Sequence, residues 1–292
     1  MQLFLSVVTS GLVNGLIYAL VGLAFVLIFR VDGVINLALG ECVMLGALFG
    51  YSLVSDFGLP LVVGAAGALA LGGGIGATTE LAVLRTLGNR DPLRMMILTF
   101  GIALVLQNVA RRIWSTDLYS IGGFPGVPAV IRIIYDRTVV QGQAVWVAAF
   151  AAFVFGIWAV VLRITSMGRE LRAVSDDREM AEAVGVPSRR LVLGAYVVGC
   201  GLAALLGFFV LPLIFFTYAG GTLLGLKGLV AALVGGLYRP LGPLAGGLLL
   251  GIGEAATAGY YSADWKDVSV FAVLITVLLV RPNGILPEVR ST

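Results

Sequence analysis

The sequence predicts an all-α, polytopic bundle of about eight or nine transmembrane helices, some of them short or broken. Of the 292 residues, 59% are hydrophobic and 12% are charged, and the mean hydropathy is +1.03. A soluble domain has about 25% charged residues, so an ordinary soluble fold is excluded. At about 20 apolar residues per span, little of the chain remains for a globular domain. We therefore expect residues 1–292 to form a single transmembrane domain.

Nine apolar runs bounded by charged residues are the expected spans. They lie near residues 3–29, 33–54, 60–84, 95–113, 143–162, 190–212, 222–238, 241–259 and 268–281. The runs are expected to be helices because an isolated strand cannot satisfy its backbone hydrogen bonds in lipid. The first run is long enough for one tilted helix, or for a short broken segment that leads into a second helix. The runs at 222–238 and 268–281 are short, which is typical of discontinuous helices beside a binding site.

The distribution of Arg and Lys predicts the orientation of the chain. If the segment 163–190 faces the cytoplasm, 13 of the 19 cationic residues lie inside and 6 lie outside, in agreement with the positive-inside rule. Nine spans then place the N-terminus outside and the C-terminus inside. The first run lacks the basic start and the cleavage site of a signal peptide, so we expect it to be retained as a helix.

The composition argues against several classes of chemistry. The chain has no histidine, and its two cysteines, Cys42 and Cys200, lie inside apolar runs where they pack as small hydrophobic residues. We therefore expect no metal site, no disulfide, no cofactor and no catalytic residue. The net charge of +3 reflects orientation in the membrane and gives no support for nucleic-acid binding.

The 40 glycines gather in regions such as 64–76 and 235–253. Small residues at four-residue spacing let helix backbones approach closely in lipid, so tight packing is the main interpretation. The alternative is that some of these glycines let a solute or a broken helix pass close to the backbone. The stretch 115–142 is the largest expected outside loop, and its glycines and prolines oppose a regular helix. It is interpreted either as a lid or docking surface or as a plain connector.

Carboxylates inside the apolar runs cost roughly 2.5–3.5 kcal/mol each, so Glu41, Glu80 and Glu254 need a role. Asn36 and Glu41 follow a break at residues 32–33 and are expected to share a helix surface. Each carboxylate either has a structural role, as a cap or as the partner of an Arg, or lines a polar route through the bundle. Thr99, Thr217 and Lys227 are further polar groups in these runs. The residues chosen as candidates for the route are Asn14, Tyr18, Asn36, Glu41, Gln107, Asn108, Tyr218 and Glu254.

The segment 163–190 is the most informative polar stretch. Asp176 or Ser175 is expected to cap a short helix, whose first turn would carry acidic residues that suit the helix dipole. An apolar stripe then follows, formed by Met180, Ala183 and Val184. Gly185 is expected to end this helix. A capped amphipathic helix in a charged inside loop favours docking to a cytosolic partner over a plain connector.

Several motifs together resemble one family along essentially the whole chain. Met167-Gly168-Arg169 is followed by charged residues, by Asp176, and by Gly185-Val186 before the next span. The other matching motifs are Asn14-Gly15 with Tyr18, Gly33-Val34-Ile35-Asn36, Gly40-Glu41, Ala232-Leu233-Val234-Gly235-Gly236, Gly251-Ile252-Gly253-Glu254-Ala255, Lys266-Asp267 and Arg281-Pro282-Asn283-Gly284-Ile285-Leu286. This order resembles the branched-chain amino-acid permeases of ABC importers.

The resemblance implies a permease subunit in the bacterial inner membrane that pairs with a second, related permease. Two cytosolic ATPases would drive the importer, and a periplasmic binding protein would deliver the solute. The segment 163–190 would be the cytoplasmic loop that docks into the ATPase, through Gly168, Arg169, Asp176, Asp177, Ala181 and Gly185. The chain itself contains no G-x-x-x-x-G-K-[ST] phosphate loop, which agrees with hydrolysis by separate subunits and with a non-enzymatic role for this one.

One departure from the family pattern bears on the solute. Many family members resemble Asn-Phe-Ala-His-Gly-Glu before the second span, whereas Leu37 and Leu39 stand here in place of the aromatic residue and the histidine. A drier lining is therefore expected. Branched-chain or other hydrophobic amino acids are the main expectation for the solute, and urea, short amides or aromatic acids are the alternatives within the family. An ion-coupled secondary transporter, with membrane carboxylates as coupling groups, is the main rival outside it.

Overall fold

The computed structural model describes residues 2–85, 91–126, 130–133, 138–282 and 284–286. The helices are α1 (Gln2–Asp32), α2 (Leu39–Tyr51), α3 (Leu61–Thr78), α4 (Pro92–Trp114), α5 (Gln143–Ile164), α6 (Ser166–Asp176), α7 (Arg178–Ala183), α8 (Ser188–Val210), α9 (Gly220–Gly235), α10 (Gly242–Tyr260) and α11 (Lys266–Val280). Short π-helical turns extend α2 over Ser52–Asp56 and α3 over Thr79–Leu84, and a 3-10 turn covers Ala263–Trp265. Two strands, β1 (Val130–Ile133) and β2 (Thr138–Gln141), form an antiparallel pair.

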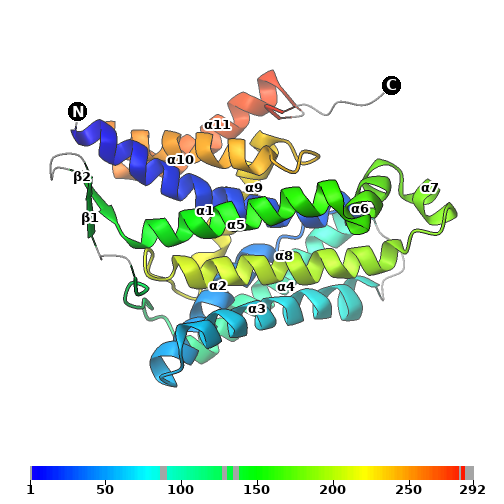
Figure 1. The fold of residues 1–292 in the computed structure, drawn as a ribbon, viewed down its shortest axis with the longest axis horizontal. Helices are drawn as coiled ribbons and strands as arrows, with labels where there is room; N and C mark the ends of the chain where they lie inside the picture. Colours follow the sequence, from blue (N-terminus) through cyan, green and yellow to red (C-terminus); the bar gives the residue numbers. More distant parts are fainter. Residues whose placement is uncertain (1, 86–90, 127–129, 134–137, 283, 287–292) are drawn as a thin grey trace.

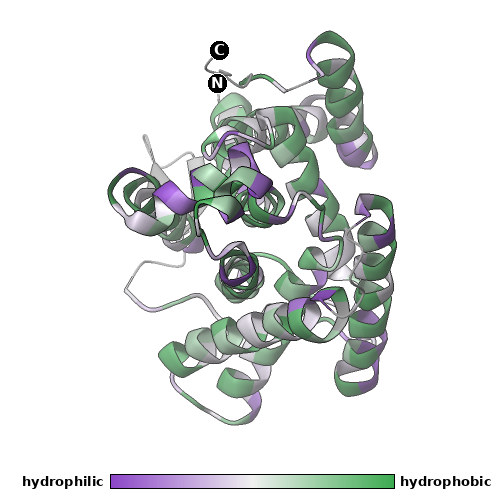
Figure 2. Ribbon diagram, turned by 90° about the vertical axis from the view of Figure 1, so that its right-hand side faces the viewer, coloured by the Kyte–Doolittle hydropathy of each residue, from purple (hydrophilic) through white to green (hydrophobic). Residues whose placement is uncertain are grey.

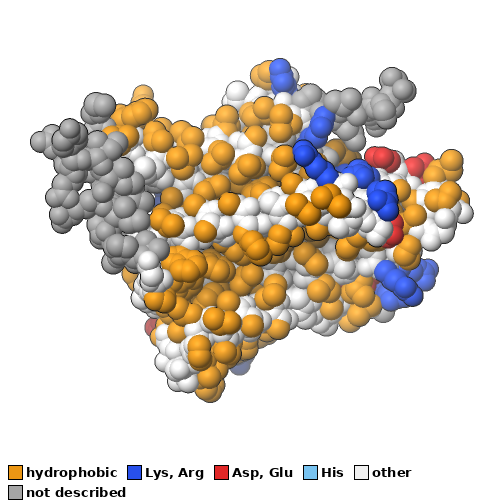
Figure 3. Space-filling model, in the orientation of Figure 1, with side chains coloured by type: hydrophobic (Ala, Val, Ile, Leu, Met, Phe, Trp, Pro, Cys, Tyr) orange, Lys and Arg blue, Asp and Glu red, His pale blue; other side chains and the backbone are white. Residues whose placement is uncertain are grey.

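The helices form one elongated bundle, which confirms the predicted all-α membrane fold. In Figure 1, α6 and α7 lie at one end and the β1–β2 pair lies at the other. Hydrophobic residues colour most of the ribbon in Figure 2, and hydrophobic side chains cover the length of the bundle on the face shown in Figure 3, where Lys and Arg gather at the α6–α7 end. Five helical segments in the described part of the chain are long and apolar enough to cross a membrane: Leu3–Asp32, Leu61–Ala82, Pro92–Trp114, Gln143–Ile164 and Ser188–Val210. Each predicted run contains a helix, while the count of eight or nine spans stays a prediction.

The first predicted run is one continuous helix of 31 residues, not a broken segment followed by a second. α1 packs against α8, α9 and α10, and so runs through the centre of the bundle. It ends at Asp32, and Gly33 then adopts φ +75°, a left-handed conformation that glycine tolerates without strain. The predicted break at this position is confirmed.

The chain between α1 and α2 is not helical, which corrects one expectation. Because α2 begins only at Leu39, Asn36 and Glu41 do not share a helix surface. The Asn36 Oδ1 atom instead accepts a hydrogen bond from the Ala38 amide at 3.0 Å. The Leu37 amide donates to Thr99 Oγ1 on α4 at 3.1 Å. Side chains therefore satisfy backbone groups that lipid could not.

Several helices are too short to cross a bilayer alone, α2 and α9 among them. α2 has 13 residues and α9 has 16, roughly 20 and 24 Å at a rise of about 1.5 Å per residue, against a hydrocarbon core of about 30 Å. Their first turns meet, since a Cβ atom on Gly40 would lie 2.6 Å from the Gly221 carbonyl oxygen. The side-chain amide nitrogen of Asn36 lies 3.9 Å from the sulfur of Cys200, which is midway along α8. α2 and α9 thus begin at a common depth inside the bundle, as discontinuous helices do beside transporter binding sites.

Glycines also allow α1 and α10 to pack backbone to backbone. A Cβ atom on Gly15 would lie 2.9 Å from the Gly247 carbonyl oxygen, and one on Gly247 would lie 2.6 Å from the Ala19 amide. Gly253, in the same helix, has open space around it. Tight packing is therefore the role of Gly15 and Gly247.

The described part of the stretch 115–142, the expected outside loop, is anchored to the chain that follows α8. Tyr119 and Phe216 exchange backbone hydrogen bonds, each 2.9 Å long. The side-chain amide of Gln143, at the start of α5, links the stretch to α8, since it accepts from the Phe124 amide and donates to the Phe209 carbonyl. These contacts favour the connector interpretation of this part. Residues 127–129 and 134–137 lie outside the described residues.

The close approach of α1 and α10 makes a testable prediction. Gly247→Ala should lower the unfolding free energy by about 1–3 kcal/mol, because the added methyl group forces two backbones apart. Gly253→Ala is the matched control and should leave stability unchanged or raise it slightly, since alanine is the better helix former. Thermal unfolding of the two variants in lipid nanodiscs checks the difference. Equal midpoints would contradict the packing described.

Candidate functional site

A cavity of about 320 Å³ lies where the first turns of α2 and α9 face α4. It is lined by Phe25, Leu37, Glu41, Phe100, Ala103, Leu104, Gln107, Thr222, Gly225, Leu226 and Leu229. Most of these side chains are apolar, and the polar groups come from α2, α4 and α9. The volume lies near the lower end of the roughly 300–1,000 Å³ typical of small-molecule pockets. The cavity therefore suits a small, largely apolar molecule that carries a few polar groups.

Glu41 is the charged group of this cavity. It lies in the first turn of α2, where the helix dipole favours a negative charge, and it is only 2% exposed. Its Oε1 atom accepts a hydrogen bond from Thr222 Oγ1 at 2.6 Å. Its Oε2 atom has no hydrogen-bond partner among the residues that the structure describes. A buried carboxylate with one free oxygen can accept a hydrogen bond from a bound molecule.

A second polar cluster joins α1, α9, α10 and α11. The Lys227 ammonium lies 2.7 Å from Glu254 Oε1 and 2.6 Å from Asp267 Oδ1. The Tyr18 hydroxyl donates to Glu254 Oε2 at 2.6 Å. Lys227, Glu254 and Tyr18 are all buried, while Asp267 is partly exposed. The cluster thus ties α1, α9 and α10 together through charge-assisted hydrogen bonds and α11 through an ion pair.

These contacts define the role of Glu254 more closely than the sequence could. A helix cap or pairing with an Arg was the expected structural role, and the observed partner is Lys227. Both carboxylate oxygens of Glu254 are engaged within the cluster. The geometry therefore favours a structural role for Glu254 and Tyr18 over a place on a solute route.

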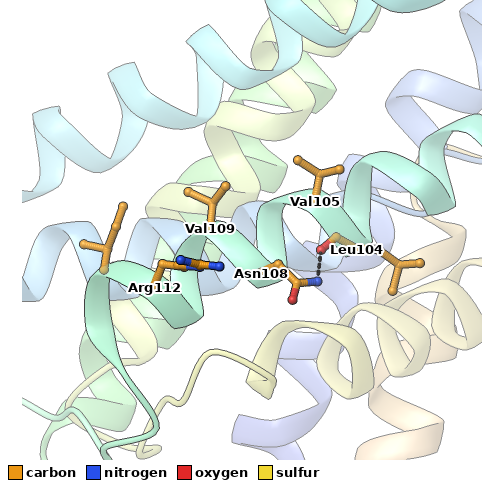
Figure 4. A pocket seen from close by; sticks show the side chains of 6 residues that line it. Leu104, Val105, Asn108, Val109 and Arg112 are labelled. Atoms are coloured by element: carbon orange, nitrogen blue, oxygen red, sulfur yellow. Dashed lines mark hydrogen bonds between the residues drawn. The ribbon is translucent and has the colours of Figure 1, made fainter.

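The remaining candidates do not converge on one cavity. Asn14 is half-buried on α1, and Asn36 lies in the segment before α2. Asn108 lies on the outer face of α4, where its side-chain amide donates to the Leu104 carbonyl at 2.7 Å (Figure 4). The Arg111 guanidinium lies over the Tyr218 ring, 5.5 Å from the ring centre. Of the eight candidates, Glu41 and Gln107 thus line the cavity.

Three partners of these candidates were missed in the sequence. Thr222 begins the run 222–238, and the shortness of that run could have indicated that its first residues lie beside a binding site. Lys227 was noted as polar but not as the partner of Glu254. Asp267 was named only as part of a family motif, and its pairing with Lys227 was not expected. Glu80, the third carboxylate considered, is buried in the turn after α3.

The outer face of α4 carries polar groups along an exposed groove. The groove has a volume of about 480 Å³ and is lined by Leu104, Val105, Asn108, Val109, Arg112 and Ile113 (Figure 4). Polar side chains on a membrane helix normally face protein or water rather than lipid. This face of α4 is therefore a poor lipid-facing surface.

The segment expected to form a docking loop consists of two short helices. Thr165 caps α6, and Asp177 caps α7 by accepting a hydrogen bond from the Met180 amide at 3.0 Å. The expected cap, Ser175 or Asp176, is wrong, because both residues belong to α6. α7 ends at Ala183, and Gly185 follows with φ +90°, so the predicted glycine stop is confirmed.

The other candidates of this segment have distinct positions. Gly168 is buried in α6, where a Cβ atom would lie 2.8 Å from the Leu162 Cα atom. Arg169 and Asp176 are exposed, and Ala181 is the buried residue of α7. Gly168 and Ala181 therefore hold the two helices against the bundle, while Arg169 and Asp176 face outward.

α7 presents apolar side chains to the outside. Met180 is 68% exposed and Val184 is 80% exposed, at the end of the molecule where cationic residues gather. Ala183 is exposed beside them, so the predicted apolar stripe has no cover within the described chain. Apolar groups exposed in this way mark contact surfaces.

The same two helices are tied to the end of α1. Arg178 lies 3.8 Å from Asp32 and 3.2 Å from Glu182. The Arg30 Nε atom contacts Ser175 Oγ at 3.4 Å. A hydrogen bond from the Ser188 hydroxyl, together with Arg178, holds the pKa of Glu182 below its usual value. The α6–α7 unit is thus mechanically connected to the helix that leads into the break before α2.

Comparisons with known proteins agree over nearly the whole chain. A family model described as branched-chain amino acid transport system / permease component matches residues 7–278. The high-affinity branched-chain amino acid transport system permease protein LivH of Escherichia coli (strain K12) is 33% identical over 304 residues, covering 99% of this chain and 97% of the relative. The corresponding permease protein BraD of Pseudomonas aeruginosa is 30% identical over 307 residues, covering 99% and 98%.

One solved structure has the same overall fold. PsaBC from Streptococcus pneumoniae in complex with Fab aligns with a TM-score of 0.52 and covers 94% of this chain and 91% of that chain. The sequence identity is 13%, so this likeness concerns the fold alone.

The Lys227 cluster makes a second prediction. Lys227→Met should destabilise the protein by about 3–5 kcal/mol, because two carboxylates lose their counter-charge inside the bundle. Adding Glu254→Gln to that variant should recover part of the loss, since the most buried carboxylate is then neutral. Lys266→Met removes an exposed lysine and is the matched control. Unfolding midpoints of the three variants are measured in detergent. Equal midpoints for Lys227→Met and Lys266→Met would contradict a stabilising role for this cluster.

Proposed function

Because the chain belongs to the family of branched-chain amino acid transport system permease components, we propose that it translocates branched-chain or other hydrophobic amino acids. It is a multi-pass protein of the inner membrane and the permease subunit of an ABC importer. Two cytosolic ATPase subunits would supply the energy, and a periplasmic binding protein would deliver the solute. The whole chain would act as one permease domain, with residues 163–190 as its coupling loop.

The observation that carries this proposal is the α6–α7 unit. Its two capped helices sit at the cationic end of the bundle and expose Met180 and Val184. An apolar stripe of this kind suits the surface of a cytosolic ATPase. The connector alternative has no use for exposed apolar residues on a unit that an ion pair and a hydrogen bond hold against α1.

The solute would pass the cavity between α2, α4 and α9. Asn108 and Arg112 lie on the adjoining outer face of α4, and a second, related permease would cover them there. The route would then run between the two permeases, with Glu41 and Gln107 on this side. A largely apolar wall favours hydrophobic amino acids over urea or short amides.

The contacts at the end of α1 suggest how ATP binding drives the cycle. Closure of the ATPases would push on α6 and α7, which hold α1 through Arg178–Asp32 and Arg30–Ser175. Movement of that end of α1 would shift the segment before α2, and with it the wall of the cavity. Alternating access would follow from this displacement of packed helices.

One observation favours a rival function. Glu41, a buried carboxylate with a free oxygen, is also what proton or sodium coupling would use. An ion-coupled transporter, however, has no need for the exposed stripe on α7.

Reconstitution separates the two functions. The chain should be combined in liposomes with its permease partner, candidate ATPases and binding protein, and uptake of labelled L-leucine measured. We expect uptake that requires internal ATP and that is unaffected by a proton or sodium gradient. Uptake by the chain alone under an ion gradient would overturn the importer proposal.

The α7 cap gives a sharper test of the coupling loop. Asp177→Ala should loosen α7 by about 0.5–2 kcal/mol through loss of the cap and should reduce ATP-driven uptake. Asp176→Ala removes the same charge one residue earlier without touching the cap, and hydrogen exchange of α7 should not change. Exchange of residues 178–184 in the permease without ATPases reads out the helix directly. Uptake at the normal rate with a loosened α7 would contradict its role in docking.

A further inference from the structure

Glu41 differs from Glu254 in its partners. Glu254 has Lys227 and Tyr18 as partners, whereas Glu41 has only the Thr222 hydroxyl among the described residues. No cationic side chain of the described chain lines its cavity. An ionised carboxylate that is 2% exposed needs a positive partner, and here the chain does not supply one.

We infer that the Glu41 carboxylate receives the ammonium group of the transported amino acid. Thr222 holds Oε1, and Oε2 lies buried beside Gly221 without a hydrogen-bond partner among the described residues, so a turn of the carboxylate toward the cavity would present it to the ammonium. The inference rests on the proposed function, because it names how the same cavity recognises its solute. The bond is charge-assisted and lies in apolar surroundings, where such bonds are strongest.

The rest of the cavity fits the rest of such a molecule. Phe25, Leu37, Phe100 and Leu229 supply apolar surface for a branched side chain. Gln107 supplies an amide whose NH2 group can donate to a carboxylate. A single charged contact in a small cavity also suits transport, because a solute must leave the site as readily as it enters.

A second cavity of similar size lacks the polar groups that would bind an amino acid. It has a volume of about 350 Å³ and lies among α1, α3, α5, α6 and α8, with apolar and aromatic side chains around it. No carboxylate or amide lines it in the described chain, so it fits a lipid acyl chain better than an amino acid.

Protection of a cysteine in the cavity wall tests the inference. Leu226→Cys places a thiol in the wall at an exposed position, and Tyr261→Cys places one on the exposed loop after α10, away from the cavity, as the control. The native Cys42 and Cys200 are buried and should not react. The assembled importer in nanodiscs is labelled with a maleimide in the presence of L-leucine, 3-methylbutylamine or 4-methylpentanoate. The amine keeps the ammonium group of leucine and the acid lacks it.

We expect L-leucine and 3-methylbutylamine to slow labelling at position 226 but not at position 261, and 4-methylpentanoate to have no effect. Adding Glu41→Gln should weaken protection by leucine about tenfold or more, because the side chain keeps its shape and its acceptor oxygen but loses its charge. Protection by the acid, or full protection by leucine in Glu41→Gln, would overturn the inference.

Uptake measured on the same preparation separates this inference from the proposed function. If labelled leucine enters with ATP but leucine gives no protection at position 226, the ammonium site is wrong and the importer stands. If no amino acid enters with ATP, the proposed function itself fails.

Discussion

The close approach of α2 to α9 is the contact on which the rest of the site depends. Gly40 meets Gly221 and Gly225 with too little space for a Cβ atom on any of the three. Because the helices can touch there, both begin inside the bundle, and their first turns bring Glu41 beside Thr222. α4 closes the remaining side without filling it, and the cavity is the result. In lipid, such an arrangement requires small residues, since apolar burial gives no driving force between helices.

Two buried carboxylates show how the same residue type takes opposite roles. Glu254 is enclosed by Lys227 and Tyr18, so its charge stabilises the contact of four helices. Glu41 has one hydroxyl partner and lines the cavity, so its charge is the one that we assign to a solute. The α6–α7 unit is linked to this second site through the end of α1 at Asp32. A route for mechanical coupling therefore runs from the exposed stripe to the cavity.

Local patterns in the sequence predicted most of the fold, whereas contacts between distant elements were beyond their reach. Apolar runs indicate helices because lipid demands them, and the break after α1 was visible at Asp32 and Gly33. The cap of α7 was misassigned by one or two residues, since Asp176 and Asp177 have equal capping chemistry and only backbone geometry distinguishes them. The pairing of Lys227 with Glu254 depends on which helix faces meet, and helical periodicity does not specify that.

A cryo-EM structure of the assembled importer with L-leucine bound would test the central claim most directly. It should place α4 against the second permease and show leucine in the cavity, with its ammonium group within hydrogen-bonding distance of Glu41 Oε2. A structure in which α4 faces lipid, with Glu41 sealed by helices of its own chain and leucine bound elsewhere, would contradict it.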